Sequence, residues 1–134
     1  MPEDGASSPG RNAIDDELGQ APRALSDAEG ALAADLSDEV VVNRCYYACF
    51  HAAEAALYDR GTNPGSHAGV LSLFGSEVVR AGDVPRAQGR LLNRLSELRK
   101  QADYGYGTID EDLPSLVSEV GQFVSDMEAL CADD

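Results

Sequence analysis

The chain has 134 residues, enough for one ordinary domain, and 43% of them are hydrophobic, with no tryptophan among them. A core built mainly from leucine, valine and alanine favours helices. The 24 acidic residues outnumber the 10 basic ones and give a formal net charge of −14. Because phosphate backbones attract excess positive charge, this balance argues against a generic nucleic-acid binder.

The choice of basic residue and the number of cysteines indicate the salt concentration and the cellular compartment in which the protein works. Lys100 is the only lysine, and an acidic, lysine-poor composition fits a halophilic organism such as an archaeon. An odd number of cysteines without a CxxC pair supports neither a disulfide framework nor a zinc site. No apolar run approaches the ~20 residues of a membrane span. We therefore expect a cytoplasmic protein without membrane contact.

The chain begins with a segment rich in Pro, Gly, Ser and acidic residues. We predict that residues 1–12 form a disordered acidic tail and that residues 13–134 form a single helical domain. Apolar residues then recur every three or four positions from Ile14 to Leu32, which predicts a helix. Pro22 interrupts this pattern, so the helix either begins there or kinks there.

Two serines mark the starts of the next helices. Ser37 is placed to cap a helix from Asp38 to about Asp59, and Ser66 to cap a third helix that continues through Arg80. Between them, the sequence "RGTNPG" at 60–65 is a turn by composition.

The last third of the chain contains two more helical patterns. Pro85 opens a fourth helix, which ends near "YGYGT" at 104–108. Thr108 and Glu111 have the spacing of a capping box for a final helix with one apolar face. No segment is typical of a strand. The prediction is an all-α protein, an antiparallel four-helix bundle with a short additional helix.

The second helix carries a stripe of polar side chains, because its members recur every three or four residues. The stripe consists of Arg44, Tyr47, His51, Glu54 and Tyr58. Arg44 and His51 are ~10 Å apart along the axis, so they could converge on a phosphate or nucleotide. Alternatively they form a structural polar layer, in which His51 bonds Glu54 or Tyr47 and Arg44 pairs with an acid of a neighbouring helix. Small residues, Cys45 and Cys49 included, indicate close helix packing.

The fourth helix concentrates half of the basic residues within fifteen positions. They are Arg86, Arg90, Arg94, Arg99 and Lys100. This electropositive surface suits a phosphate or an acidic partner, or else its arginines pair with acids nearby. His67 has no second His or Cys at ligand spacing, so we expect no metal site and no cofactor.

Three segments carry a resemblance to a known family. They are "RCYYACFHAA" at 44–53, "SHAGVLSLF" at 66–74 and "ELRKQADYGYG" at 97–107. In order and spacing they resemble the HEPN domain family, in a subfamily with an RxYYxxFHAA helix and a late RxxADY motif. The resemblance implies a helical bundle that forms a homodimer. It also implies a minimal nucleotidyltransferase partner encoded nearby, the two acting as toxin and antitoxin.

Many members of this family are metal-independent ribonucleases with an arginine and a histidine separated by four to six residues. Arg44 and His51 fit that spacing and are the candidate catalytic pair. Histidine would exchange the proton of a ribose hydroxyl, and arginine would stabilise the phosphate in the transition state. The late motif, however, has Arg99, Asp103 and Tyr104 where toxin-type relatives carry a histidine.

Two hypotheses therefore remain. The first is a binding module for nucleotide, RNA or the nucleotidyltransferase, in which Tyr47, Arg99, Asp103 and Tyr104 contact the ligand or partner. The second is a ribonuclease that uses Arg44 and His51. Tyr104 is also a candidate for nucleotidyl modification by the partner, by similarity to tyrosines of toxin-type relatives.

Overall fold

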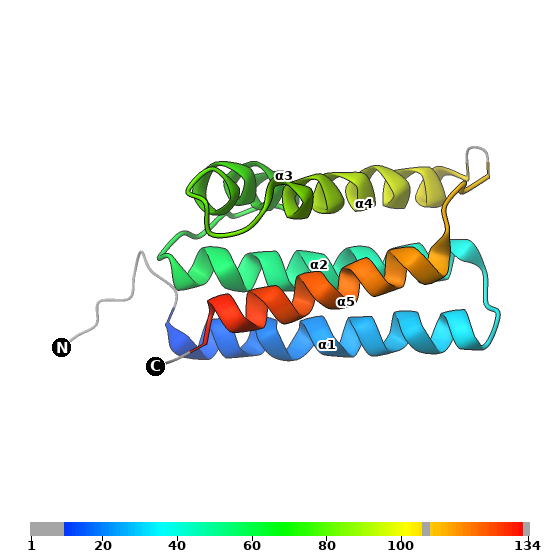
Figure 1. The fold of residues 1–134 in the computed structure, drawn as a ribbon, viewed down its shortest axis with the longest axis horizontal. Helices are drawn as coiled ribbons and strands as arrows, with labels where there is room; N and C mark the ends of the chain where they lie inside the picture. Colours follow the sequence, from blue (N-terminus) through cyan, green and yellow to red (C-terminus); the bar gives the residue numbers. More distant parts are fainter. Residues whose placement is uncertain (1–9, 106–107, 133–134) are drawn as a thin grey trace.

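The computed structural model describes residues 10–105 and 108–132, and these fold into helices without a strand. Four long helices lie side by side and alternate in direction, so that the fold class predicted from the sequence is confirmed (Figure 1). The elements are α1 (Arg11–Ala33), α2 (Asp38–Asp59), α3 (His67–Leu73), the π-helical turn η1 (Phe74–Val79), α4 (Arg86–Tyr104) and α5 (Leu113–Leu130).

Helix α2 is central and packs against all the other helical elements. More than half of its residues are buried, and many of them are alanine or cysteine, which lets neighbouring helices approach closely. The predicted packing role of Cys45 and Cys49 is confirmed, because both are fully buried and unpaired. Burial raises the pKa of the Cys45 thiol to about 12 and that of Cys49 well above its usual range.

The predicted caps explain where α2 and α3 begin. The hydroxyl of Ser37 accepts a hydrogen bond from the Val40 amide, and that of Ser66 accepts one from the Gly69 amide. Each serine side chain thus accepts from an amide of the first turn, as an N-cap residue does. The predicted bounds of α2 are confirmed at both ends.

Helix α5 begins differently from the prediction of a capping box at Thr108 and Glu111. Asp112 is the N-cap, and its carboxylate accepts a hydrogen bond from the Ser115 amide. Pro114 lies in the first turn, where its missing amide costs nothing. Glu111 instead pairs with Arg94 of α4 at 2.7 Å. The predicted apolar face of α5 is confirmed, since it is buried from Leu113 to Met127.

Helix α1 is longer than the apolar pattern suggested. It begins at Arg11, two residues inside the predicted tail, and continues through Pro22, so the alternative in which a helix starts at Pro22 is wrong. Residues 1–9 lie outside the described part. The third predicted helix is also modified, because its second half is the π-helical turn η1, which buries Phe74 and Val78. None of the described helices has both the length and the apolar character needed to cross a membrane.

Candidate functional site

The polar stripe of α2 faces α1, and Arg44 lies near its N-terminal end. Both Nε and Nη2 of Arg44 donate to the side-chain oxygen of Asn43, at 3.0 and 2.8 Å. Nη1 lies 4.0 Å from a carboxylate oxygen of Asp27 on α1. The prediction that Arg44 pairs with an acid of a neighbouring helix is thus confirmed. The guanidinium remains about one-third exposed and can still contact a ligand.

His51 contacts a residue that the sequence pattern did not indicate. Its Nδ1 lies 2.7 Å from a carboxylate oxygen of Glu17 on α1. The expected hydrogen bond to Glu54 or Tyr47 is therefore replaced by a bond between helices. A carboxylate that accepts from Nδ1–H leaves the lone pair on Nε2, where a neutral imidazole can take up a proton.

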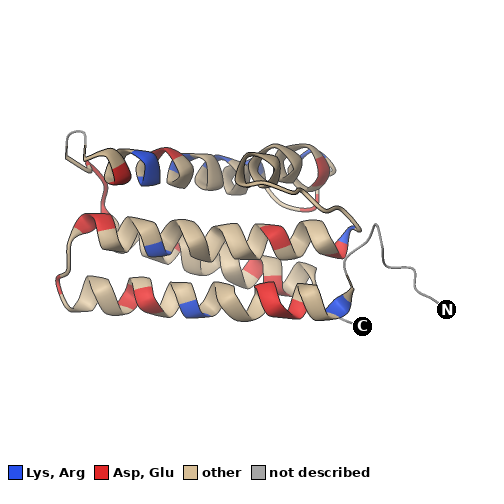
Figure 2. Cartoon of the chain, turned by 180° about the vertical axis from the view of Figure 1, so that it is seen from behind, with Lys and Arg blue, Asp and Glu red and all other residues tan. Residues whose placement is uncertain are grey.

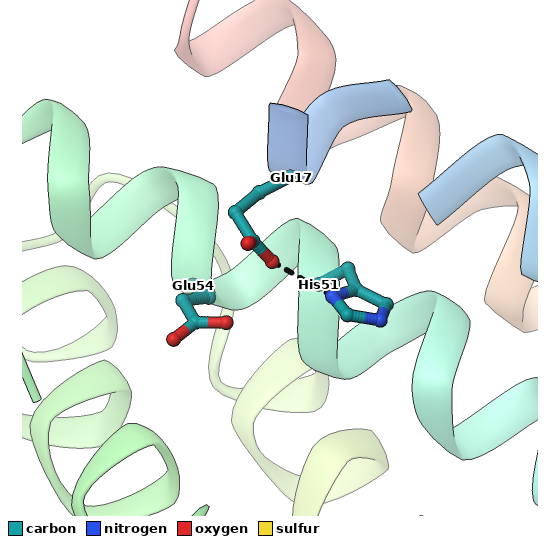
Figure 3. A group of neighbouring side chains, drawn as sticks. All are labelled: Glu17, His51 and Glu54. Carbon is teal, nitrogen blue, oxygen red and sulfur yellow. Dashed lines mark hydrogen bonds and ion pairs between the residues drawn. The ribbon is translucent and has the colours of Figure 1, made fainter. Parts of the chain in front are cut away.

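Glu54, one turn along α2 from His51, lies on the other side of Glu17 (Figure 3). Burial, followed by the hydrogen bond and negative charge of Glu17, raises the pKa of Glu54 to about 7. Burial acts in the same direction on Glu17, but hydrogen bonds from His51 and Glu54 outweigh it and lower the pKa of Glu17. Of the two neighbouring carboxyl groups, Glu54 is therefore the one that favours the protonated form and Glu17 the one that favours the charged form.

Tyr47 of α2 lies near arginines of both α2 and α4. The guanidinium carbon of Arg44 lies 5.3 Å from the centre of the Tyr47 ring, and that of Arg99 lies 5.9 Å from it. Both distances are within the range of cation–π attraction. Arg44, Tyr47 and His51 also line one cavity of about 270 Å³, closed on the other side by α1. The structure thus brings together three of the predicted site residues and adds Arg99 through the tyrosine.

A cluster of aromatic rings, which we call the aromatic cluster, continues from Tyr47 toward α3. It consists of Tyr46, Tyr47, Phe50 and His67. The His67 ring stacks on Phe50 with centres 4.2 Å apart, and its Nδ1 lies 3.0 Å from the Tyr46 hydroxyl. Burial, followed by the nearby Arg99 and His51 side chains, lowers the pKa of His67 and so favours its neutral imidazole.

A second cavity, of about 640 Å³, lies between α3 and α4 beside the aromatic cluster. Its walls include Tyr46, His67, Arg99 and Lys100. Arg99 stacks on Tyr46 at 4.8 Å, and its buried Nε has no hydrogen-bond partner among the described residues. No sequence pattern connects His67 with Arg99. Their proximity depends on how α3 docks against α4, and no spacing within one segment reveals it.

The remaining predicted contacts lie at the end of α4. Asp103 accepts an ion-pair contact from Arg99 at 3.3 Å, one helical turn away. Tyr104 is the last residue of α4 and not part of the following turn, and 70% of its surface is exposed. The helix ends at Gly105, whose φ of 68° lies in the left-handed region that glycine adopts readily. Of the glycine-rich break predicted at 104–108, residues 106 and 107 lie outside the described part.

The basic residues of α4 divide into paired and unpaired groups. Arg94 pairs with Glu111 and Glu119 of the last connection and helix, as the structural alternative predicted. Arg86 and Arg90 make no ion pair with any described residue. Acidic positions are spread over α1 and the ends of α2, whereas α4 carries basic positions among acidic ones (Figure 2). Among the described residues, Arg23 of α1 and Arg80 after η1 also lack an ion pair, so α4 carries two of the four unpaired arginines.

Together these features define a class of protein, an all-α bundle whose central helix presents arginine, tyrosine and histidine to two cavities. A family model described as HEPN domain matches residues 14–130, which is most of the chain. The chain belongs to the HEPN domain family.

Curated relatives agree with this assignment. A protein of Methanocaldococcus jannaschii named "Putative toxin MJ0605" is 38% identical over 84 residues, covering 62% of this chain and 63% of that protein. A "UPF0332 protein" of Thermotoga maritima is 35% identical over 94 residues, covering 69% and 71%. "Putative toxin MJ0142", also from M. jannaschii, is 30% identical over 66 residues, or 49% and 45%.

Proposed function

We propose that this chain is the toxin-like component of a two-gene module with a minimal nucleotidyltransferase, and that it binds nucleotide or RNA. Two relatives carry toxin names, and the family resemblance implies such a partner. We further propose a cytoplasmic homodimer from a halophilic organism, which the family resemblance and the acidic, lysine-poor composition support.

The observation that carries the binding proposal is the meeting of Arg44 and Arg99 on Tyr47. Two arginines from different helices contact one aromatic ring, each within 6 Å of its centre. Guanidinium groups bind phosphate oxygens through paired hydrogen bonds, and a flat ring next to them offers a stacking surface for a base. The unpaired Nε of Arg99 provides a donor that no described residue uses. The charges and rings thus match the two halves of a nucleotide.

The test measures binding of fluorescently labelled single-stranded RNA and of ATP in EDTA, over a range of salt concentrations. We expect Arg99→Ala and Arg44→Ala each to weaken binding about tenfold or more. That loss corresponds to at least ~1.4 kcal/mol, as for a charged hydrogen bond.

Arg90→Ala is the matched control, because Arg90 is an exposed arginine of α4 without an ion pair. It should weaken binding only slightly and in a salt-dependent way. Equal losses in all three variants would indicate attraction by charge alone and would contradict the proposed site.

The partner proposal has its own tests. Co-expression with the nucleotidyltransferase encoded nearby should yield a complex that survives purification. Incubation with that partner and ATP should add a nucleotidyl group to Tyr104, visible by mass spectrometry and absent in Tyr104→Phe. A chain that purifies alone beside its expressed neighbour would refute the module, and an unmodified Tyr104 would refute the modification.

A second candidate function is metal-independent RNA cleavage. The observation that favours it is that Arg44 and His51 line the same cavity, with His51 held by Glu17. In this mechanism Nε2 of His51 takes the proton of the ribose 2′-hydroxyl as that oxygen attacks phosphorus. The bond from phosphorus to the 5′-oxygen breaks, leaving a 2′,3′-cyclic phosphate, and the departing 5′-oxygen takes up a proton from water. Arg44 stabilises the extra negative charge on the phosphate oxygens.

Cleavage of RNA in high salt and EDTA tests this candidate. His51→Ala should abolish cleavage while far-UV circular dichroism stays unchanged, and Arg90→Ala should cleave like the wild type. Cleavage that persists in His51→Ala, or that never exceeds the background of a mock purification, would reject the ribonuclease function.

A further inference from the structure

Glu17, His51 and Glu54 place three potential metal ligands next to one another on two helices (Figure 3). One carboxylate oxygen of each glutamate and a ring nitrogen of His51 all lie within 4.8 Å of one another. Sequence spacing alone indicated no metal site, because Glu17 lies 34 residues before His51 and reaches it only through the packing of α1 on α2. We propose that these three residues bind one divalent transition-metal ion.

The donor atoms determine which class of ion fits. An imidazole with two carboxylates suits Zn²⁺, Mn²⁺, Fe²⁺ or Co²⁺, whereas Mg²⁺ and Ca²⁺ prefer oxygen ligands only. The Nδ1 atom of His51, which faces Glu17, is the nitrogen that would bind the metal. Metal binding there leaves the proton on Nε2, the tautomer opposite to the one that the Glu17 hydrogen bond favours in the absence of metal.

The distances are compatible with one ion after a small movement. Bonds of about 2.1 Å place two ligands of the same metal at most about 4.2 Å apart. The Glu17 and His51 atoms, at 2.7 Å, already satisfy that limit. A rotation of the Glu54 side chain brings its oxygen closer, since a glutamate has three side-chain torsions.

The surroundings also favour a cation. No ion pair among the described residues joins Glu17 or Glu54 to an arginine or a lysine, and the one ion pair of this group is that of Glu17 with His51. The Tyr58 hydroxyl donates to Oε2 of Glu54 at 3.0 Å, an outer hydrogen bond of the kind that surrounds metal ligands. The side chains of Glu17 and His51 are 19% and 25% exposed, which leaves coordination positions open to water.

The proposal goes beyond RNA binding or cleavage and does not depend on either. Its test is direct binding of Co²⁺ and Zn²⁺ to the EDTA-treated, dialysed full-length chain, without RNA. High salt is needed because 24 acidic residues attract cations without specificity. We expect one equivalent of Co²⁺ with visible absorption bands, which Zn²⁺ displaces. Glu17→Gln, Glu54→Gln and His51→Ala should each weaken binding tenfold or more.

Glu29→Gln is the matched control, because Glu29 is an exposed glutamate of the same helix as Glu17. It should bind Co²⁺ like the wild type. In NMR spectra of the wild type, bound Co²⁺ should also broaden or shift the backbone amide signals of residues around Glu17 and His51, but not those of residues near Arg90. This second measurement requires no variant to fold. Weak, non-saturating binding, or signals that change equally over the whole surface, would overturn the proposal.

Discussion

Replacing Glu54 by glutamine should stabilise the fold above neutral pH. Burial and the Glu17 carboxylate raise the pKa of Glu54 from 4.5 to about 7 in the folded protein. The folded state therefore holds this proton more tightly than the unfolded chain. The resulting stability is fully present below about pH 4.5 and is lost as the pH rises through about 7. Glutamine resembles the protonated acid, because its amide can donate to Glu17 and its carbonyl can accept from Tyr58.

The magnitude follows from the two pKa values. The difference between 4.5 and about 7 corresponds to ~3.4 kcal/mol at 1.36 kcal/mol per pH unit. Glu54 is only half-buried, and solvent screening reduces this figure. We expect Glu54→Gln to unfold with a free energy ~1–2 kcal/mol larger than that of the wild type near pH 8.5. The difference should vanish well below pH 4.5, where Glu54 is protonated in both states.

Urea unfolding followed by far-UV circular dichroism measures this effect. The experiments should contain EDTA, so that metal binding does not contribute, and should be repeated at several pH values. Glu29→Gln, which removes an exposed charge from α1, should differ little from the wild type at any pH. A Glu54→Gln variant that is less stable at high pH, or whose advantage does not grow with pH, would refute the raised pKa of Glu54 in the folded protein.

Three further predictions concern the packing of the bundle. Burial raises the pKa of all three cysteine thiols, to about 12 for Cys45 and about 11 for Cys131, so a thiol reagent should label the folded protein much more slowly than the urea-unfolded chain. Gly69→Ala should cost ~1–3 kcal/mol in urea unfolding, because its Cβ would lie 2.5 Å from the Pro64 carbonyl oxygen. Phe123→Ala should cost ~3–5 kcal/mol, since this fully buried ring packs on Phe74. Rapid labelling, or a cost below ~0.5 kcal/mol in either variant, would contradict the packing described.

Local sequence features predicted most of the helices correctly. The bounds of α2 follow from the Ser37 cap and an uninterrupted run of helix formers. The buried face of α5 follows from apolar residues that recur every three or four positions. The errors arose where two local signals compete. At the start of α5 the sequence offers two possible N-caps, Thr108 with Glu111 three residues later and Asp112 with Ser115 three residues later. Glu111 pairs with Arg94 instead of with the helix start, and Asp112 is the N-cap. Pro22 was a boundary signal that the packing of α1 on α2 overrides.

The site shows which long-range contacts a sequence can reveal. Glu17 and His51 lie at nearly equal distances along the chain on either side of Asp35, and so do Asp27 and Arg44. In an antiparallel helix pair joined near Asp35, such residues face one another. That symmetry could have indicated Glu17 as the partner of His51. No comparable symmetry places His67 beside Arg99, because α3 and η1 interrupt the connection between α2 and α4.

The candidate site combines contacts between two consecutive helices with contacts to a helix much later in the chain. The contacts of His51 and Arg44 with α1 lie within one hairpin of consecutive helices, whereas the Arg99 contact with Tyr47 requires α4 to dock. A transient separation of α4 would open the larger cavity and release Arg99 but leave the Glu17–His51 pair intact. We therefore expect the amides of α4 to exchange hydrogen with solvent sooner than those of α2. A large ligand such as RNA could enter during that opening.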